Sequence, residues 1–564
     1  MRKIINSPGA FVDEVIDGLL LTHPMQLRAV STDRRALVRV DAGTGGKVGI
    51  VTGGGSGHLP LFLGYVGRGL ASGVAVGNVF SSPSAEQIFE ATKASDDGAG
   101  VLYLYGNYGG DIYNFDIAGD MAEGVGIRTT TVLGADDIAS APEDKKSTRR
   151  GVAGLFFAYK TAGASADRGD DLDAVTAIAQ RTCDNVLTMG VGLSPTILPA
   201  AGQPTFTLGE GEMEIGVGIH GEPGIHRGAL ESADDITNRF MSAILSEMKP
   251  VGGDRVAVLV NGLGATPLEE LYIIYRRAHQ ILTDCGVVVA KLYIGEYATS
   301  LEMSGASLSV LKLDQELEEL LDAPAESPFY CNGTVDTGSV RPVASSVAVS
   351  KRKQRTVAVK TVKNPSALLE TAKSVLGLMP RYAEELRALD AALGDGDLGI
   401  TVASGATSAV RVLDNLPADA APSEILRAIG AAFASANPST FAALIGGGLM
   451  AAGVKYDDSE EVNAHSLGKA LRVMTDRVQE RGGARVGDKT VVDVLDAVAS
   501  VLAEDTSRNV IDSAIETASQ IVEFSAGKQS QKGRAAWVGE RSVGQKDPGQ
   551  VAFVRMLEAV RGSL

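Results

Sequence analysis

The sequence is poor in cysteine, in aromatic residues and in long apolar runs. Its three cysteines lie far apart along the chain, which excludes a disulfide framework and is typical of a reducing compartment. Aromatic residues make up 5% of the chain and include one tryptophan, Trp537. No run approaches the roughly 18 apolar residues of a membrane-spanning helix, and acidic residues interrupt the apolar stretch within residues 1–24, unlike a signal peptide. We therefore expect a soluble, cytoplasmic protein without a membrane partner.

Basic residues are outnumbered as well. The chain has 52 lysines and arginines against 69 aspartates and glutamates, a formal net charge of −17 at pH 7. This charge disfavours binding to nucleic acid or to an anionic membrane. The hydrophobic share of 45% excludes a disordered chain, and the length of 564 residues predicts several domains. Glycine is abundant at 67 residues without a collagen-like period, which indicates loops where the backbone approaches a ligand closely.

The first part of the chain, residues 1–330, alternates short apolar runs with helical patterns and predicts an α/β domain. A capping box at 266–269 predicts a helix that runs to Gly286, and Ser232 marks the start of another. Six apolar runs are expected to be buried strands: 47–52, 100–105, 127–133, 212–219, 255–260 and 287–294.

The remainder has a different texture. Residues 331–363 are small, polar and basic without a helical period, and we interpret them as a linker whose KRKQR cluster is solvated rather than nucleic-acid-binding. Residues 364–564 hold alanine-rich amphipathic segments that predict an all-α domain of about eight helices, in a bundle or barrel. The glycines of this part are expected in its loops.

Three glycine-rich loops follow predicted strands, at 53–60, 106–111 and 218–224. The carboxyl ends of strands are where α/β proteins bind ligands, so these loops can converge on one pocket. Each loop by itself is also compatible with a tight turn, and the first lacks the spacing of a dinucleotide loop and the lysine of a P-loop. Together they supply His58, His220 and a carboxylate, a set suited to acid/base or nucleophilic chemistry.

A fourth loop concentrates carboxylates. Asp390 ends a predicted helix, and Asp395 and Asp397 follow within a glycine loop. Carboxylates this close repel one another unless a cation neutralises them, and oxygen ligands suit Mg²⁺ with phosphates completing its shell. A solvated acidic turn is the alternative. Loops that are candidates to hold a nucleotide lie at 437–440, 487–490 and 544–549.

In chain order the motifs GGGSGH, NYxGD, GIHGEPG, GDGD and GRAxxxGERSxGxxDPG resemble the dihydroxyacetone kinase family. The resemblance spans essentially the whole chain and matches the fused form, in which a ketose-binding domain precedes a helical nucleotide-binding domain. It implies an ATP-dependent kinase of a short ketose that forms a homodimer. His220 matches the family's histidine that holds the ketone as a hemiaminal. His58 and Asp111 match residues that flank the substrate hydroxyls, and one or both would accept the proton.

The resemblance also assigns residues to ligands. The substrate-binding positions are Gly55, Ser56, Gly57, His58, Gly106 and Asp111. The aspartates that would hold two Mg²⁺ ions against ATP are Asp390, Asp395 and Asp397. The nucleotide-binding positions are Leu398, Gly399, Thr401, Ser439, Thr440, Thr490, Asp547, Pro548 and Gly549.

Departures from the family pattern bear on the substrate. Leu59 replaces an acidic residue, Gly106 replaces a lysine, and Leu398 replaces a histidine. The family's glycine-rich GGTSG reads PSTF at 438–441, which puts the detail of that phosphate loop in doubt. Losing a lysine and an acid near the first pocket removes one charge of each sign and makes room. We therefore expect a four-carbon ketose such as erythrulose, with dihydroxyacetone as the alternative.

Two other functions are compatible with the same motifs. A non-catalytic paralogue would bind a ketose as a sensor, but it would not need the three aspartates together with both pocket histidines. A lyase that cyclises a flavin nucleotide would use Mn²⁺ or a similar cation and only the helical domain.

Overall fold

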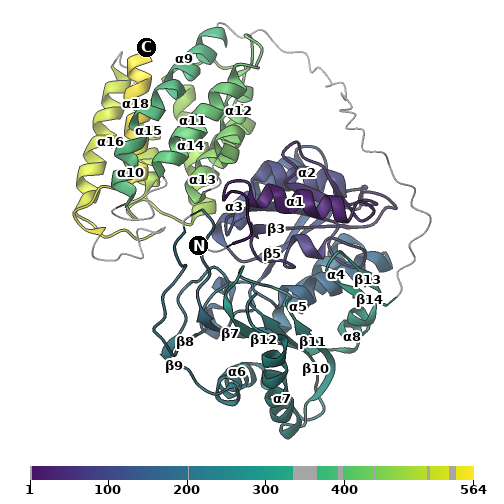
Figure 1. Cartoon of the computed structure of the whole chain (residues 1–564). Helices are drawn as coiled ribbons and strands as arrows, with labels where there is room; N and C mark the ends of the chain where they lie inside the picture. The colour runs from purple at the N-terminus through teal and green to yellow at the C-terminus, as the bar shows by residue number, and fades with distance from the viewer. Residues whose placement is uncertain are drawn as a thin grey trace. The chain divides into compact units, whose positions relative to one another are not determined.

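The computed structural model describes residues 3–200, 202–333, 365–391, 398–436, 439–504, 509–532 and 542–563, with side chains from 368 onward in the third range. The chain divides into two compact units, Met1–Ala344 and Ser345–Leu564 (Figure 1). The first is α/β and the second is helical, which confirms the predicted fold class.

The first unit holds a six-stranded sheet with strand order β1-β2-β4-β3-β5-β6. Strands β3, β4, β5 and β6 run parallel, so their carboxyl ends meet at one edge. The strands are β1 Leu27–Ala29, β2 Ala36–Arg39, β3 Gly49–Ser56, β4 Gly73–Val79, β5 Val101–Gly106 and β6 Thr129–Gly134. The accompanying helices are α1 Phe11–Thr22, η1 Leu63–Tyr65, α2 Ala85–Ser95, α3 Gly109–Glu123, η2 Glu143–Thr148, α4 Leu155–Arg168 and α5 Leu172–Asn185.

A second six-stranded sheet follows, with order β11-β10-β12-β7-β8-β9. Only β10 and β11 are parallel among its described pairs. The strands are β7 Val186–Ser194, β8 Glu212–Ile215, β9 His226–Ala229, β10 Arg255–Gly262, β11 Val288–Gly295 and β12 Ser304–Leu313. The helices are α6 Ala233–Met248, α7 Leu268–Asp284 and α8 Gln315–Asp322, and a small ladder pairs β13 Ala325–Glu326 with β14 Cys331–Asn332.

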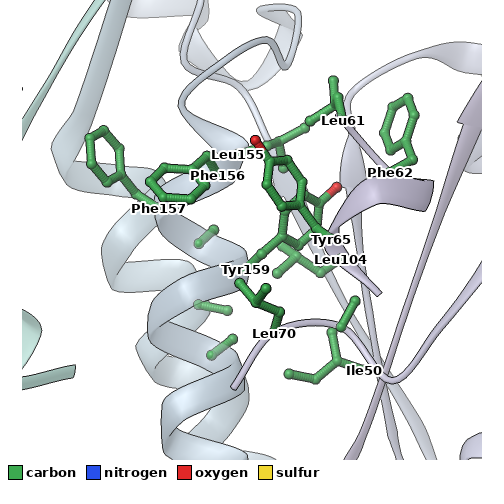
Figure 2. Close-up of a cluster of buried hydrophobic side chains, with 14 of the residues drawn as sticks. Ile50, Leu61, Phe62, Tyr65, Leu70, Leu104, Leu155, Phe156, Phe157 and Tyr159 are labelled. Atoms are coloured by element: carbon green, nitrogen blue, oxygen red, sulfur yellow. The ribbon is translucent and has the colours of Figure 1, made fainter. Parts of the chain in front are cut away.

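Helix α4 forms the centre of this unit and packs against both sheets. Ile50 of β3 and Leu259 of β10 belong to the same buried cluster as α4, whereas the neighbouring Val51 packs with α2 and α3. This alternation arises because successive strand residues point to opposite faces of a sheet. Figure 2 shows Phe156 and Tyr159 of α4 gathered with Tyr65 beside the strands. The dense packing holds the strand ends, and hence the loops that follow them, in fixed positions.

The predicted strands coincide with observed ones, except that β3 continues to Ser56 through the glycines expected in a loop and another strand ends early. Residues 212–219 were expected to form one strand, but β8 ends at Ile215 because Gly216 adopts φ +81° and turns the chain. Ser232 caps α6 as predicted, since its side chain accepts from the Asp235 backbone N–H. The capping box at 266–269 is wrong: the Thr266 hydroxyl instead exchanges hydrogen bonds with the backbone of Gly305.

The second unit is a ring of packed helices. Contacts run in order from α11 through α12, α13, α14, α15 and α16 to α18, and α9 closes the ring by touching both α11 and α18. The helices are α9 Pro365–Leu378, η3 Met379–Tyr382, α10 Ala383–Ala391, α11 Leu398–Leu413, α12 Pro422–Ala436, α13 Thr440–Lys455, α14 Ala464–Gly482, α15 Val491–Glu504, α16 Val510–Ala526 and α18 Pro548–Ser563.

Glycines in this unit are not confined to loops, contrary to the expectation. A Cβ on Gly430 of α12 would lie 2.6 Å from the Gly446 carbonyl oxygen of α13, and a Cβ on Gly446 would lie 2.5 Å from that of Gly430. The two helices therefore approach so closely that only glycine fits at the crossing.

Two further expectations meet the described residues. Cys331 and Asn332, placed at the start of the predicted linker, pair instead with β13, and residues 334–363 lie outside the described residues. No helix in the described ranges is long and apolar enough to cross a membrane.

Candidate functional site

The predicted loops of the first unit bring their histidines together at the carboxyl edge of the first sheet. His58 follows β3 and His220 follows β8, yet their rings meet edge to face with centroids 4.8 Å apart. Phe80, after β4, stacks on His58 at 4.7 Å, and Tyr108, before α3, meets His220 at 4.8 Å. The strand-end loops thus bring these side chains together in one cluster.

His58 is held as a neutral imidazole. Its side chain is buried, and Nδ1 lies 2.8 Å from the carbonyl oxygen of Thr299. Because a carbonyl only accepts, Nδ1 carries the proton and Nε2 keeps a lone pair. Burial and the neighbouring His220 lower the pKa of His58 to about 3. Nε2 is buried without a hydrogen-bond partner in the described part of the chain, so it is available to a ligand.

Asp111 lies in the first turn of α3 and is 5% exposed. Burial raises the pKa of this carboxyl to about 7, against the opposing effects of the Ser82 hydroxyl and of His220. Its Oδ1 atom has no partner among the described residues. A carboxyl poised near neutrality is suited to accept a proton at physiological pH.

His220 is oriented by a carboxylate two residues away. Its Nδ1 lies 3.0 Å from Glu222 Oε1, and its backbone N–H donates to Glu222 Oε2 at 3.0 Å. Burial acts to raise the pKa of Glu222, but the hydrogen bond from His220 and the charge of Arg150 outweigh it and hold the pKa at about 2. The ionised carboxylate therefore accepts from Nδ1, which leaves the Nε2 lone pair of His220 free to act as a nucleophile.

The glycines of the first two loops have steric reasons. A Cβ on Gly55 would lie 2.7 Å from the Ser81 backbone nitrogen, and Gly57 adopts φ +105°. A Cβ on Gly106 would lie 3.0 Å from the Tyr108 ring, so that ring stands beside the position where the family carries a lysine.

Loops of the second unit also converge. The Gln550 side chain donates to the Thr490 carbonyl oxygen at 3.0 Å, and a Cβ on Gly549 would lie 3.2 Å from the Phe441 ring. The amino-terminal ends of α13, α15 and α18 thus lie together. Ser439 caps α13 by accepting from the Ala442 backbone N–H. Clustered helix amino termini attract phosphate groups through their dipoles and free N–H groups.

A buried carboxyl lies among these loops. Burial raises the pKa of Asp547 to about 7, and the nearby Asp493 raises it further while Lys489 opposes. Asp493, which sequence reasoning missed, accepts from the backbone N–H groups of Gly487 and Thr490 at 2.5 and 2.8 Å. Its only sequence signal is its place in the first turn of α15, a position that favours acids in any helix.

The predicted metal loop is described only in part. Asp390 Oδ2 accepts from the Leu398 backbone N–H at 3.1 Å, so its carboxylate is tied to the start of α11. Asp395 and Asp397 lie outside the described residues, and the described ranges contain no group of three metal-ligating side chains. Thr401 is buried in α11, and Gly399 packs on α10, since its Cβ would lie 2.0 Å from the Ala383 oxygen.

Arg150 and Tyr108 are further members of the first site that sequence reasoning did not assign. Arg150 lies 3.8 Å from Glu222, and the Tyr108 hydroxyl is buried without a partner in the described residues. Tyr108 could have been identified from the sequence, because it lies inside the NYxGD motif. Arg150 lies between two secondary-structure elements and outside every motif, so no pattern marked it.

Known proteins resemble the chain along its whole length. The family model described as the Dak1 domain matches residues 17–329, and that described as the DAK2 domain matches residues 392–562. An L-erythrulose kinase from Pectobacterium atrosepticum is 35% identical over 100% of this chain and 97% of its own. A D-erythrulose kinase from Mycolicibacterium smegmatis is 34% identical over 98% of this chain and 97% of its own.

A solved structure is similar to the chain in its fold as well. The dihydroxyacetone kinase from C. freundii, in complex with AMP-PNP and Mg²⁺, is 28% identical and covers 100% of both chains with a TM-score of 0.53.

Proposed function

The chain belongs to the dihydroxyacetone kinase family, and from this membership we propose that it is an ATP-dependent kinase of a terminal hydroxyl on a short-chain ketose. The observation that carries the proposal is the cluster of His58, Asp111 and His220. It offers a lone pair on His220 beside two buried acceptors, His58 Nε2 and Asp111 Oδ1, that have no partner among the described residues. Relatives of similar length that are named as ketose kinases support it.

His220 selects the ketose. Its Nε2 lone pair attacks the carbonyl carbon, the C–O π electrons move to oxygen, and the Nδ1 proton is transferred to that oxygen to give a neutral hemiaminal. Glu222 stabilises the positive charge that the ring carries between these two events. An alcohol such as glycerol has no carbonyl carbon and cannot be held in this way.

Asp111 is the better proton acceptor for the hydroxyl that becomes phosphorylated. The pKa of Asp111 is raised to about 7 by burial, whereas the pKa of His58 is lowered to about 3 by burial. A base with a pKa near the working pH accepts a proton effectively and still returns it. His58 then serves to accept a hydrogen bond through Nε2 and to orient the substrate.

The second unit is proposed to bind ATP and two Mg²⁺ ions. Asp390 is fixed at the start of α11, and Asp395 and Asp397 complete the proposed set. When bound, Mg²⁺ neutralises phosphate charge and aligns the γ-phosphoryl group for in-line transfer. Ser439, Thr440, Thr490 and the 547–549 loop supply helix amino termini for the phosphates.

Erythrulose is the proposed substrate, with dihydroxyacetone as the alternative. Two relatives of nearly equal identity are named as kinases of opposite erythrulose enantiomers, so identity favours a four-carbon ketose without assigning its hand. We further propose that the protein is cytoplasmic and that it forms a homodimer, as the family resemblance implies. Sedimentation equilibrium would measure the number of subunits.

Steady-state assays with ATP test the function. L-erythrulose, D-erythrulose, dihydroxyacetone, glyceraldehyde and glycerol are compared, and an erythrulose is expected to give the highest kcat/KM and glycerol no turnover. Glycerol phosphorylation at the rate of the best ketose would contradict the hemiaminal. Ketose binding without any turnover would instead favour the sensor, and a cyclic product from a flavin nucleotide with Mn²⁺ would favour the lyase.

A further inference from the structure

Arg150 is a partly buried cation fixed by acceptors that follow strands of both sheets of the first unit. Its Nε donates to Asp137 Oδ2 at 2.9 Å, and its Nη2 donates to the Gly216 carbonyl oxygen at 3.0 Å. Its side chain is 13% exposed. Asp137 follows β6 of the first sheet and Gly216 follows β8 of the second, so the guanidinium is held from two directions.

The remaining nitrogen of this guanidinium approaches the His220 loop. Arg150 Nη1 lies 3.8 Å from Glu222 Oε2. A Cβ built on Gly218 would lie 2.5 Å from Arg150 Nη1 and 2.1 Å from Glu222 Oε2. Any side chain at position 218 would therefore come between cation and carboxylate. A purely structural pair with Asp137 would require neither this glycine nor the third nitrogen.

Glu222 transmits the charge to the nucleophile. Its two oxygens separately accept from the ring Nδ1 and from the backbone N–H of His220, which fixes both the ring and the loop beneath it. Losing the negative charge of Glu222 would release the Nδ1 proton from its acceptor and allow the other tautomer, in which Nε2 has no lone pair to offer.

Arg150 is the one permanent cation among the described groups around this pair. Asp137, which follows β6, pairs with Arg150. Tyr108, which precedes α3, and His58, which follows β3, both contact the ring of His220. The titratable and charged groups that face His220 and Glu222 are Arg150, Asp137, Tyr108, His58 and Asp111. Removing Arg150 takes away the positive charge that lowers the pKa of Glu222, so protonation of Glu222 becomes more favourable.

We propose that Arg150 is a positioning residue that keeps Glu222 ionised and in place, so that Glu222 holds the Nδ1 proton of His220 and the Nε2 lone pair is presented to the ketone. The inference rests on the proposed function, because it concerns how the nucleophile of that reaction is prepared. Arg150 acts through Glu222 and need not touch the substrate.

The test measures the hemiaminal directly in the full-length enzyme without ATP. A ketose labelled with ¹³C at the carbonyl carbon is titrated by NMR into wild type, Arg150→Met, Arg150→Lys, Glu222→Gln and the Arg150→Met/Glu222→Gln double variant over a range of pH. Arg150→Met is expected to weaken hemiaminal formation about tenfold or more, as for loss of a charge-assisted contact. Its acid-side loss of hemiaminal moves to higher pH, and Arg150→Lys recovers part of both effects.

The double variant separates positioning from a direct role. If Arg150 acts through Glu222, the double variant is no weaker than Glu222→Gln alone. Arg128→Met is the matched control, because Arg128 pairs with Asp173 at an exposed site and should leave the hemiaminal unchanged. If Arg150→Met does not fold, a pH profile that is shifted less in Arg150→Lys than in Arg150→Gln supports the proposal, and equal profiles overturn it.

Failure of this inference is distinguishable from failure of the proposed function. Wild type that phosphorylates ketoses, together with Arg150→Met that keeps the full hemiaminal and its pH profile, overturns the inference alone. Additive effects of Arg150→Met and Glu222→Gln do the same. Phosphorylation without any hemiaminal in wild type overturns the inference and the role of His220, while the kinase activity stands.

Discussion

Single atoms of the first site are buried and unsatisfied. His58 Nε2, Asp111 Oδ1 and the Tyr108 hydroxyl have no hydrogen-bond partner in the described part of the chain. An unsatisfied buried polar group destabilises a protein by about 1–3 kcal/mol. The hydroxyls and carbonyl of a ketose provide both donors and acceptors, so a ketose bound at the proposed site would satisfy these three atoms.

Asp111→Asn is expected to change both catalysis and the pH dependence of stability. Without the proton acceptor we expect kcat to fall about 100-fold or more, whereas in wild type kcat rises with pH as this carboxyl, its pKa raised to about 7 by burial, ionises. Unfolded aspartate has a pKa of about 4, so between these values the folded state binds more protons than the unfolded state. Wild-type stability therefore falls with rising pH over this window.

The measurement is thermal unfolding of both proteins over about pH 4 to about pH 8, the window set by linkage. The unfolding midpoint of wild type should decline relative to that of Asp111→Asn as the pH rises. Parallel curves for the two proteins would show that the raised pKa is wrong, independently of any kinetic result.

At the scale of elements, local sequence patterns predicted the strands but did not predict the contacts that helices make. The strands were predicted from contiguous apolar runs bounded by glycine, and such runs are typical of strands buried on both faces of a parallel sheet. Thr266 had the pattern of a helix cap, but its hydroxyl instead donates a hydrogen bond to the carbonyl oxygen of Gly305, which is distant in sequence. The glycines of α12 and α13 were expected in loops, because the sequence of one helix does not show how closely a second helix will approach it.

Gly446→Ala is expected to destabilise the helical unit. Its Cβ would lie 2.5 Å from the Gly430 carbonyl oxygen, so the two helices must separate, a change that costs about 1–3 kcal/mol. The control is Gly377→Ala in α9, where a Cβ meets nothing within 4 Å and the variant should be neutral or stabilised. Urea unfolding followed by circular dichroism measures both, and equal stability of the two variants would contradict the close crossing.

For the whole molecule, the chemistry is divided between two compact units. The pocket histidines and Asp111 lie in Met1–Ala344, and the clustered helix amino termini lie in Ser345–Leu564. The proposed ketose site and the proposed nucleotide site thus belong to different units, and we expect each ligand to bind without the other.

A chain of residues 1–344 is expected to bind a ketose but to phosphorylate nothing. Its core, including α4 between the two sheets, is complete within that unit. Isothermal titration with erythrulose should give a dissociation constant within about threefold of that of full-length protein, since the described residues of the proposed site all belong to this unit. Loss of ketose binding in a folded 1–344 chain would mean that the second unit contributes to the pocket.

The amino-acid sequence by itself determined the two-part architecture and the strand-end loops, and it predicted His58, Asp111 and His220 as site residues, because apolar periodicity and contiguous motifs are local properties. Tertiary structure decided what no local pattern contains. It placed Tyr108 beside Gly106, turned Thr299 towards His58, and brought Arg150 through the gap left by Gly218 to Glu222. These contacts depend on how two separate sheets pack around α4, and that packing sets the pKa of Asp111 and the tautomer of His220.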